Sequence, residues 1–123
     1  MFCSILISNF NKSHFIERCL NSLINQSYKN FEIIFSDNGS TDNSLEIVSK
    51  FNGIKVIKTP RFTNSPALNQ IDVLNNAFLI SKGEYIFLLD SDDFYETNKI
   101  EKIINHQKKK KLEFVCDVPR IYF

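Results

Sequence analysis

Short apolar runs alternate with segments of helical spacing along the whole chain, and this alternation is the feature that most limits the fold. Apolar runs typical of strands lie at residues 2–8, 30–37, 54–59, 84–90 and 112–118. Between them, apolar residues recur at helical spacing, which predicts helices at 13–26, 43–51, 68–81 and 98–110. Strands joined by helices through short connections form βαβ units. We therefore expect an α/β fold with a mostly parallel sheet and helices on both faces.

The ends of these helices carry their own signals. Ser13 is the expected cap of the first helix, and Ser40, Thr41 and Asp42 are candidate caps of the second. The third helix is marked by Leu68, Ile71, Leu74 (or Val73), Phe78 and Leu79, and Gly83 is its expected C-terminal stop.

Length and composition fit one globular domain. The 123 residues can bury a core, and 43% hydrophobic and 24% charged residues are ordinary values. The net charge of +1 gives no reason to expect a nucleic acid as partner. No apolar run approaches the roughly 20 residues of a membrane span, and the start MFCSILIS lacks a signal peptide's basic segment. Three separated cysteines without CxxC spacing fit reduced thiols in the cytoplasm better than disulfides or a zinc site.

Polar residues follow three of the predicted strands at the points where those strands end. Ser8 and Asn9 follow the first strand, Asp37 to Ser40 the second, and Asp90 to Asp93 the fourth. Ligands of open parallel sheets bind beyond the carboxyl ends of the strands, and the sheet brings these ends to one edge. The sequence therefore predicts one site built from all three segments. The simpler alternative for each segment is a polar turn leading into a helix.

The chemistry of this site is narrowed by motifs that the chain lacks. No GxGxxG and no GxxxxGK[ST] motif is present, so a nucleotide diphosphate would need another counter-charge. A divalent cation held by carboxylates supplies it, since Mg²⁺ and Mn²⁺ prefer oxygen ligands. Asp90 and Asp92 are two positions apart at a strand end and point the same way. One can bind the cation while the other accepts a sugar hydroxyl.

Two segments resemble the hallmarks of family 2 glycosyltransferases, which have the GT-A fold. The segment ISNFNKSHFIERCLNSLINQSYKNFEIIFSDNGSTDNS is similar to the opening of that family. SKGEYIFLLDSDD is similar to its second hallmark, which ends in the DxD motif. Both lie in the family's order and spacing. The resemblance covers nearly the whole chain and implies a single, Rossmann-like nucleotide-sugar-binding domain over residues 1–123.

The resemblance also implies an activity. It is the metal-dependent transfer of a sugar from a nucleotide diphosphate sugar, commonly a UDP-sugar, to a glycan or lipid-linked acceptor in surface polysaccharide or lipooligosaccharide synthesis. The implied cofactor is Mn²⁺ or Mg²⁺. A lipid-linked acceptor would place the protein peripherally at the inner face of the membrane.

The family's nucleotide contacts can be carried over to the first two strand ends. By resemblance, Asp37 matches the acid that hydrogen-bonds the base, commonly uracil. Ser8 lies in the segment whose backbone lines the base pocket, and Asn9 belongs to the same segment.

The acidic turn matches the DxD motif. By resemblance, Asp90 is the acid near the ribose and donor sugar, with Ser91 beside it, and Asp92 is the acid that coordinates the metal. Asp90 is a second candidate metal ligand. Asp93 is either a neighbour of the metal site or a helix cap.

Several positions depart from the family pattern. Asn38 stands where a second acid is usual, and Ser8 replaces a proline. Leu74 to Ala77 stand where Arg-Asn-x-Gly is common, so a basic residue near the donor is missing. Arg61 is a candidate replacement, although loop arginines on a surface are common.

The elements that bind the acceptor are expected to be missing. Family members continue with further strands and a catalytic-base acid, whereas this chain stops at DVPRIYF. We expect a fold truncated after about five strands, with the base beyond Phe123; Asp117 is a candidate by position only. The alternative function is a catalytically silent module that binds nucleotide sugar. An exposed sheet edge and apolar face would favour a homodimer.

Overall fold

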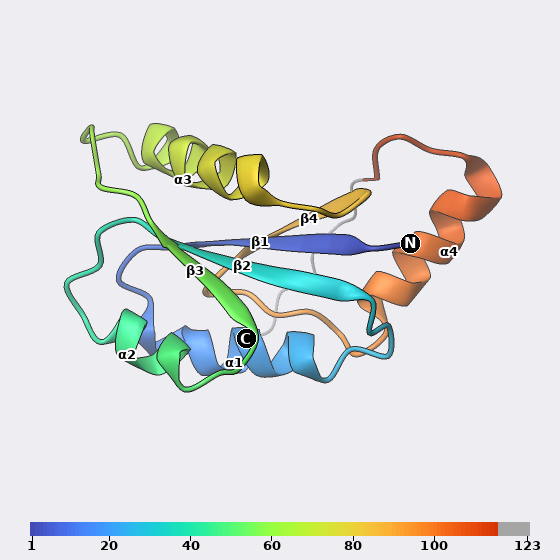
Figure 1. Ribbon diagram of the computed structural model, residues 1–123, viewed down its shortest axis with the longest axis horizontal. Coiled ribbons are helices and arrows are strands. Elements are labelled where there is room, and N and C mark those ends of the chain that lie inside the picture. Colours follow the sequence, from blue (N-terminus) through green and yellow to red (C-terminus); the bar gives the residue numbers. More distant parts are fainter. Residues whose placement is uncertain (116–123) are drawn as a thin grey trace, which may run out of the picture.

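The computed structural model describes residues 1–115, which form a parallel sheet with helices on both faces (Figure 1). The strands are β1 (Cys3–Asn9), β2 (Phe31–Asp37), β3 (Ile54–Lys58) and β4 (Tyr85–Asp90). The helices are α1 (Ser13–Ile24), α2 (Ser44–Ser49), α3 (Pro66–Ile80) and α4 (Lys99–Lys110). The strand order is β3-β2-β1-β4, so β1 is central and pairs with both β2 and β4. The predicted α/β fold with a mostly parallel sheet is confirmed.

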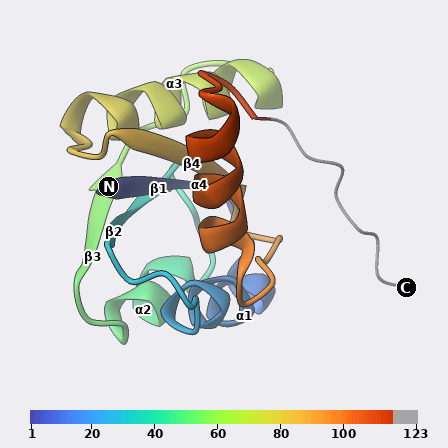
Figure 2. The same ribbon diagram turned by 90° about the vertical axis from the view of Figure 1, so that its right-hand side faces the viewer.

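The two faces of the sheet are covered unequally. Alternate residues of β1 and β2, including Ile5, Ile7 and Phe35, fill a large core together with side chains of α1, α2 and α4. Figure 2 shows α3 on the other side of the sheet from α1 and α2. Leu6, Ile34 and Ala77 form the smaller core beneath α3. The central strand is therefore buried on both faces, as its apolar run predicts.

The predicted helix α3 is present, but most of the apolar residues that mark it in the sequence face outward. Leu68, Ile71, Phe78 and Leu79 are between 51% and 71% exposed. The buried residues of this helix are Asn69, Val73 and Ala77. The sheet offers only Leu6 and Ile34 to α3 as fully buried apolar residues, flanked by Ser4 and Ser36. Ile57, Leu74 and Ile86 pack at the margin of this small core and are only partly buried, and the other large apolar residues of α3 lie outside it.

The predicted fifth strand is not found in residues 112–115, the part of it that the structure describes. Helix α4 ends where Lys111 takes a left-handed conformation (φ 52°), and the Lys111 N–H donates to the carbonyl of Gln107. The Gln107 side chain then donates to the Leu112 carbonyl. These contacts turn the chain, and Phe114 is left 82% exposed. Residues 116–118 of the predicted strand, with Cys116 and Asp117, lie outside the described residues.

Gly83 has a different role from the predicted helix stop. Helix α3 ends at Ile80 with Ser81 in an extended conformation, so no left-handed glycine is needed there. Gly83 instead packs directly on β1, where an added Cβ would lie 2.4 Å from the backbone nitrogen of Ser4. Its N–H donates to the Ser4 hydroxyl over 2.8 Å. Only glycine lets the segment before β4 approach β1 this closely.

We predict that Gly83→Ala destabilises the protein by about 3 kcal/mol, because the added methyl group meets backbone that cannot move independently. Denaturant unfolding followed by circular dichroism measures this change. Gly53→Ala is the matched control, since Gly53 has a positive φ of 75° but nothing within 4 Å of an added Cβ. The control should lose only about 1 kcal/mol. A smaller loss for Gly83→Ala than for the control would contradict the close packing.

Candidate functional site

The carboxyl ends of β1, β2 and β4 meet at one edge of the sheet, as predicted. In the strand register Ser8 lies opposite Asp90, and Asn9 lies opposite Asp37. A cavity of about 300 Å³ opens at this edge. Ser8, Asn9, Asp90, Ser91 and Asp92 all lie in its wall, so the structure brings these predicted site residues together.

A buried chain of hydrogen bonds joins the three strand ends. The Ser91 hydroxyl donates to Asn9 Oδ1 over 2.7 Å, and Asn9 Nδ2 donates to Asp37 Oδ1 over 2.9 Å. All three side chains are at most 2% exposed. Asn9 is therefore the link between β4 and β2, and it holds the Asp37 carboxylate one layer behind the cavity wall.

Asp37 is further held by the turn that follows it. Gly39 adopts a positive φ of 75°, which turns the chain back so that the Ser40 N–H donates to Asp37 Oδ2 over 2.9 Å. The Ser40 hydroxyl donates to Asp37 Oδ1 over 2.6 Å. Ser40 thus supports the carboxylate rather than capping a helix, which corrects the sequence prediction.

Asp42 joins the starts of two helices. Its Oδ2 accepts the N–H of Ser13 and its Oδ1 accepts the N–H of Ser44, each over 3.0 Å. The N-cap of α2 is Asn43 rather than the predicted Asp42, and Asp42 bonds the first N–H of α2 from one residue farther back. Its contact with the first residue of α1 was not predicted. The predicted cap Ser13 is itself the first residue of α1, and its N–H is satisfied by Asp42. Asp42 fixes the segment between β1 and α1 against the segment that follows β2.

Asp90 is held from α3. Gln70 Nε2 donates to Asp90 Oδ1 over 2.6 Å and to the Ser8 hydroxyl over 3.1 Å. The Ser8 hydroxyl also donates to Asp90 Oδ1 over 3.1 Å. Gln70 was not predicted, because nothing in the local sequence indicates that this residue of α3 reaches the end of β4. The neutral amide lies one helical turn before Leu74, the position where the family pattern has arginine.

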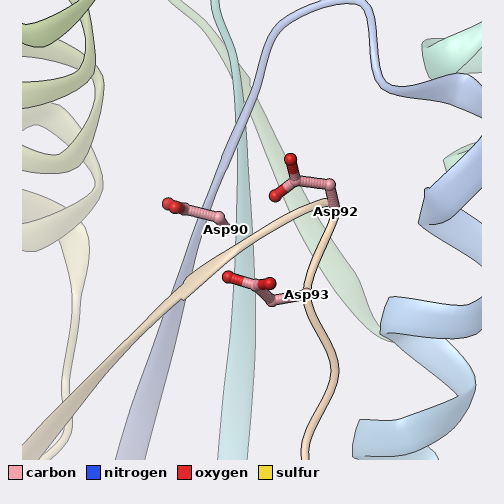
Figure 3. Close-up of side chains that lie close together, drawn as sticks. All are labelled: Asp90, Asp92 and Asp93. Atoms are coloured by element: carbon pink, nitrogen blue, oxygen red, sulfur yellow. The ribbon is translucent and has the colours of Figure 1, made fainter. Parts of the chain in front are cut away.

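Three carboxylates gather at the end of β4 (Figure 3). Asp90, Asp92 and Asp93 each offer an oxygen, and these oxygens lie within 4.8 Å of one another. Burial, followed by the charges of Asp92 and Asp90, raises the pKa of the Asp93 carboxyl. The structure also excludes the helix-cap role considered for Asp93, since α4 begins only at Lys99. Clustered carboxylate oxygens of this kind are the ligands that Mg²⁺ and Mn²⁺ prefer.

Two basic side chains, one just before α1 and one in the middle of that helix, approach Asp92. Lys12 Nζ lies 3.2 Å from Asp92 Oδ2. Arg18 Nη2 donates to the backbone carbonyl of Asp92 over 3.1 Å, and its guanidinium lies over the ring of Phe94, 4.7 Å from the centroid. Sequence patterns missed both contacts, although the position of Lys12 just after β1 placed it near the predicted site.

The wall of the cavity also contains Arg61, the residue considered as a replacement for the missing basic group. Its guanidinium lies over the Phe10 ring, 3.7 Å from the centroid, and its Nη1 donates to Asn38 Oδ1 over 3.2 Å. Asn38 in turn donates to the Thr59 carbonyl over 2.9 Å. These contacts hold Arg61 at the cavity instead of in solvent, and they explain how an uncharged Asn38 fits here.

Comparisons with known proteins identify the family and the fold of the chain. The model of the family described as "Glycosyl transferase family 2" matches residues 4–123. The Escherichia coli UDP-Glc:alpha-D-GlcNAc-diphosphoundecaprenol beta-1,3-glucosyltransferase WfaP is 35% identical over 111 residues, which cover 90% of this chain and 43% of that protein. The Bacillus spizizenii poly(ribitol-phosphate) beta-glucosyltransferase is 35% identical over 115 residues, which cover 89% of this chain and 18% of that protein.

A solved structure matches the fold as well. The S. aureus TarS fragment 1–349 in complex with UDP-GlcNAc superimposes with a TM-score of 0.72 and is 28% identical. The match covers 89% of this chain and 32% of that one. The chain thus spans less than half the length of each of these three proteins.

We predict that Asn9→Ala lowers the free energy of unfolding by about 3 kcal/mol, because the Asp37 carboxylate and the Ser91 hydroxyl lose a buried partner. Urea unfolding curves of both proteins measure the difference. The matched control is Asn105→Ala, an exposed position on α4, which should change stability by no more than about 0.5 kcal/mol. Equal stabilities of the two variants would show that Asn9 does not join the strand ends energetically.

Proposed function

Because the chain belongs to glycosyl transferase family 2, we propose that it binds a nucleotide diphosphate sugar and forms the donor side of a glycosyltransferase. The observation that carries this proposal is the cavity at the joined strand ends, with the carboxylates of Asp90 and Asp92 in its wall. A nucleotide diphosphate sugar needs a pocket for its base and ribose and a counter-charge for its phosphates. This edge of the sheet offers a cavity and a group of metal-binding oxygens side by side.

We propose a UDP-sugar as the donor. Two similar proteins support this choice: the TarS fragment was solved with UDP-GlcNAc, and the name of the E. coli relative specifies UDP-Glc. In this proposal Ser8, Asn9 and Ser91 line the nucleotide pocket. Asp90 accepts hydrogen bonds from the ribose or the donor sugar.

Asp37 is proposed to recognise the base. Its carboxylate already accepts three hydrogen bonds, one from Asn9 and two from Ser40. A carboxylate has about four acceptor positions, so one remains for an N–H of the base. Asp37 is 1% exposed, and a base therefore reaches it only when the cavity wall moves. Until then the carboxylate mainly holds Asn9 in place.

A divalent cation, Mg²⁺ or Mn²⁺, fits the residues present. The carboxylate oxygens of Asp90 and Asp92 suit either ion. The Lys12 ammonium is paired with Asp92, so this position already accommodates a positive charge. When bound, the ion would neutralise charge on the leaving diphosphate. Gln70 and Ser8 hold the Asp90 carboxylate, and Arg18 holds the backbone at Asp92, so the ligands are oriented in advance.

The acceptor is proposed to be a glycan or a lipid-linked saccharide, the class suggested by the names of the relatives. Within residues 1–115, no helix combines the length and the apolar character that crossing a membrane requires. Transfer also needs a carboxylate that removes the proton of the acceptor hydroxyl. We assign this base to none of the described residues, and Asp117 lies outside them.

We predict that UDP binds measurably in the presence of Mn²⁺ and that Asp92→Asn weakens this binding at least about tenfold, because the metal loses a charged ligand. Isothermal titration calorimetry of UDP with and without Mn²⁺ measures both effects. Asp72→Asn is the matched control, since Asp72 lies on α3 and is not part of the cavity wall.

The results of the calorimetry and of activity assays distinguish a transferase from a binding module and from a chain without a nucleotide site. Absence of binding by UDP and by GDP would refute the nucleotide site, and equal affinities of Asp92→Asn and Asp72→Asn would refute the role of Asp92. UDP binding without sugar transfer or donor hydrolysis would identify the chain as a binding module without catalytic activity.

A further inference from the structure

Lys12 differs from the other basic residues of the site because its ammonium group pairs with a carboxylate of the acidic turn. Its ammonium group is 3.2 Å from Asp92 Oδ2, one of the oxygens that the proposed cation needs. Both side chains line the cavity, and both remain accessible, with 47% of the Lys12 and 38% of the Asp92 side chain exposed. A half-exposed ion pair of this kind is weak and exchanges its partners readily.

The other two basic groups are fixed by contacts that do not involve a carboxylate of the cluster. Arg18 donates to the backbone carbonyl of Asp92, and its guanidinium contacts the rings of Phe15 and Phe94. Arg61 lies over Phe10 and bonds the Asn38 amide. Within the described part of the chain, Lys12 is therefore the basic residue that a metal bound to Asp92 would displace directly.

The backbone of Lys12 is anchored, whereas its side chain is about half exposed. Lys12 immediately precedes α1, and the N–H of the next residue, Ser13, is held by Asp42. A lysine has a flexible stem and a compact charge, so its ammonium can change partners inside the cavity without a backbone movement.

We propose that Lys12 is an exchangeable counter-ion that couples metal binding to diphosphate binding; this inference rests on the proposed function. In the metal-free protein Lys12 neutralises Asp92. A divalent cation bound at Asp92 would weaken the ion pair, because the cation and the ammonium would repel each other beside one carboxylate. The released Lys12 then bonds an oxygen of the diphosphate in the same cavity. The new bond between Lys12 and the diphosphate would thereby offset the free energy that the metal spends on breaking the ion pair between Lys12 and Asp92.

The proposal predicts effects of opposite sign for one substitution. Lys12→Met should bind Mn²⁺ about threefold more tightly than the wild type in the absence of nucleotide, because the competing ammonium is gone. With Mn²⁺ at saturation, the same variant should bind UDP about tenfold more weakly, because a charge-assisted hydrogen bond to the diphosphate is lost. Binding of uridine, which has no phosphates, should not change.

Electron paramagnetic resonance of free Mn²⁺ measures the first affinity, and calorimetry measures the binding of UDP and uridine. Lys50→Met is the matched control: it removes the same charge from an exposed position at the end of α2, outside the cavity wall. Because Lys12 is itself exposed, neither substitution disturbs the core.

A change of Mn²⁺ affinity in the same direction and of the same size in Lys50→Met would overturn the exchange, since it would be an effect of net charge. Unchanged UDP affinity in Lys12→Met would overturn the contact with the diphosphate. If the wild type binds neither Mn²⁺ nor UDP, the proposed function fails and the exchange fails with it. If the wild type binds both and Lys12→Met matches Lys50→Met, only the exchange is wrong.

Discussion

The hydrogen bond between Asn9 and Asp37 is the interaction on which the site depends. It lies between two buried polar side chains, and each would be costly to leave without a partner. Through Ser91 on one side and Ser40 on the other, it connects the end of β4, the end of β1 and the turn after β2. The positions of the cavity wall and of the acidic turn follow from this connection. Backbone hydrogen bonds also join these ends, from Asn38 to Asn9 and from Ser91 to Ser8, and the Asn9 side chain adds the connection between the buried polar groups.

Two basic residues contact the acidic turn at the end of β4 in different ways. One bonds its backbone, and the other pairs with a carboxylate side chain. Arg18 fixes the turn through the carbonyl of Asp92 and through stacking on Phe94. The carboxylate of Asp92 is paired only with the movable Lys12, according to the contacts of the described residues. In the proposed function, a fixed backbone and an exchangeable counter-charge would let the acidic turn bind a cation with little rearrangement.

The fold and the location of the site could be predicted because both depend on patterns within single segments. Buried strands show as apolar runs, and polar residues at three strand ends meet because parallel strands end at one edge. Predictions failed where the outcome depended on contacts between segments. The outward-facing apolar residues of α3 reflect the small core beneath this helix, and the close packing of Gly83 follows from its approach to Ser4. Gln70 and Lys12 were missed for the same reason, since their partners are 20 and 80 residues away in the chain.

The central claim is that the ends of β1, β2 and β4 form one site for a metal and a nucleotide. Paramagnetic Mn²⁺ tests it directly, because the ion broadens the amide NMR signals of the residues around it. The account predicts that Mn²⁺ broadens the signals of Lys12 and of Asp90 to Asp93 first, and that UDP then shifts those of Asn9 and Asn38. Signals of Phe31 and Tyr85, at the opposite ends of their strands, should stay sharp. Broadening centred elsewhere, or UDP shifts away from these strand ends, would contradict the account.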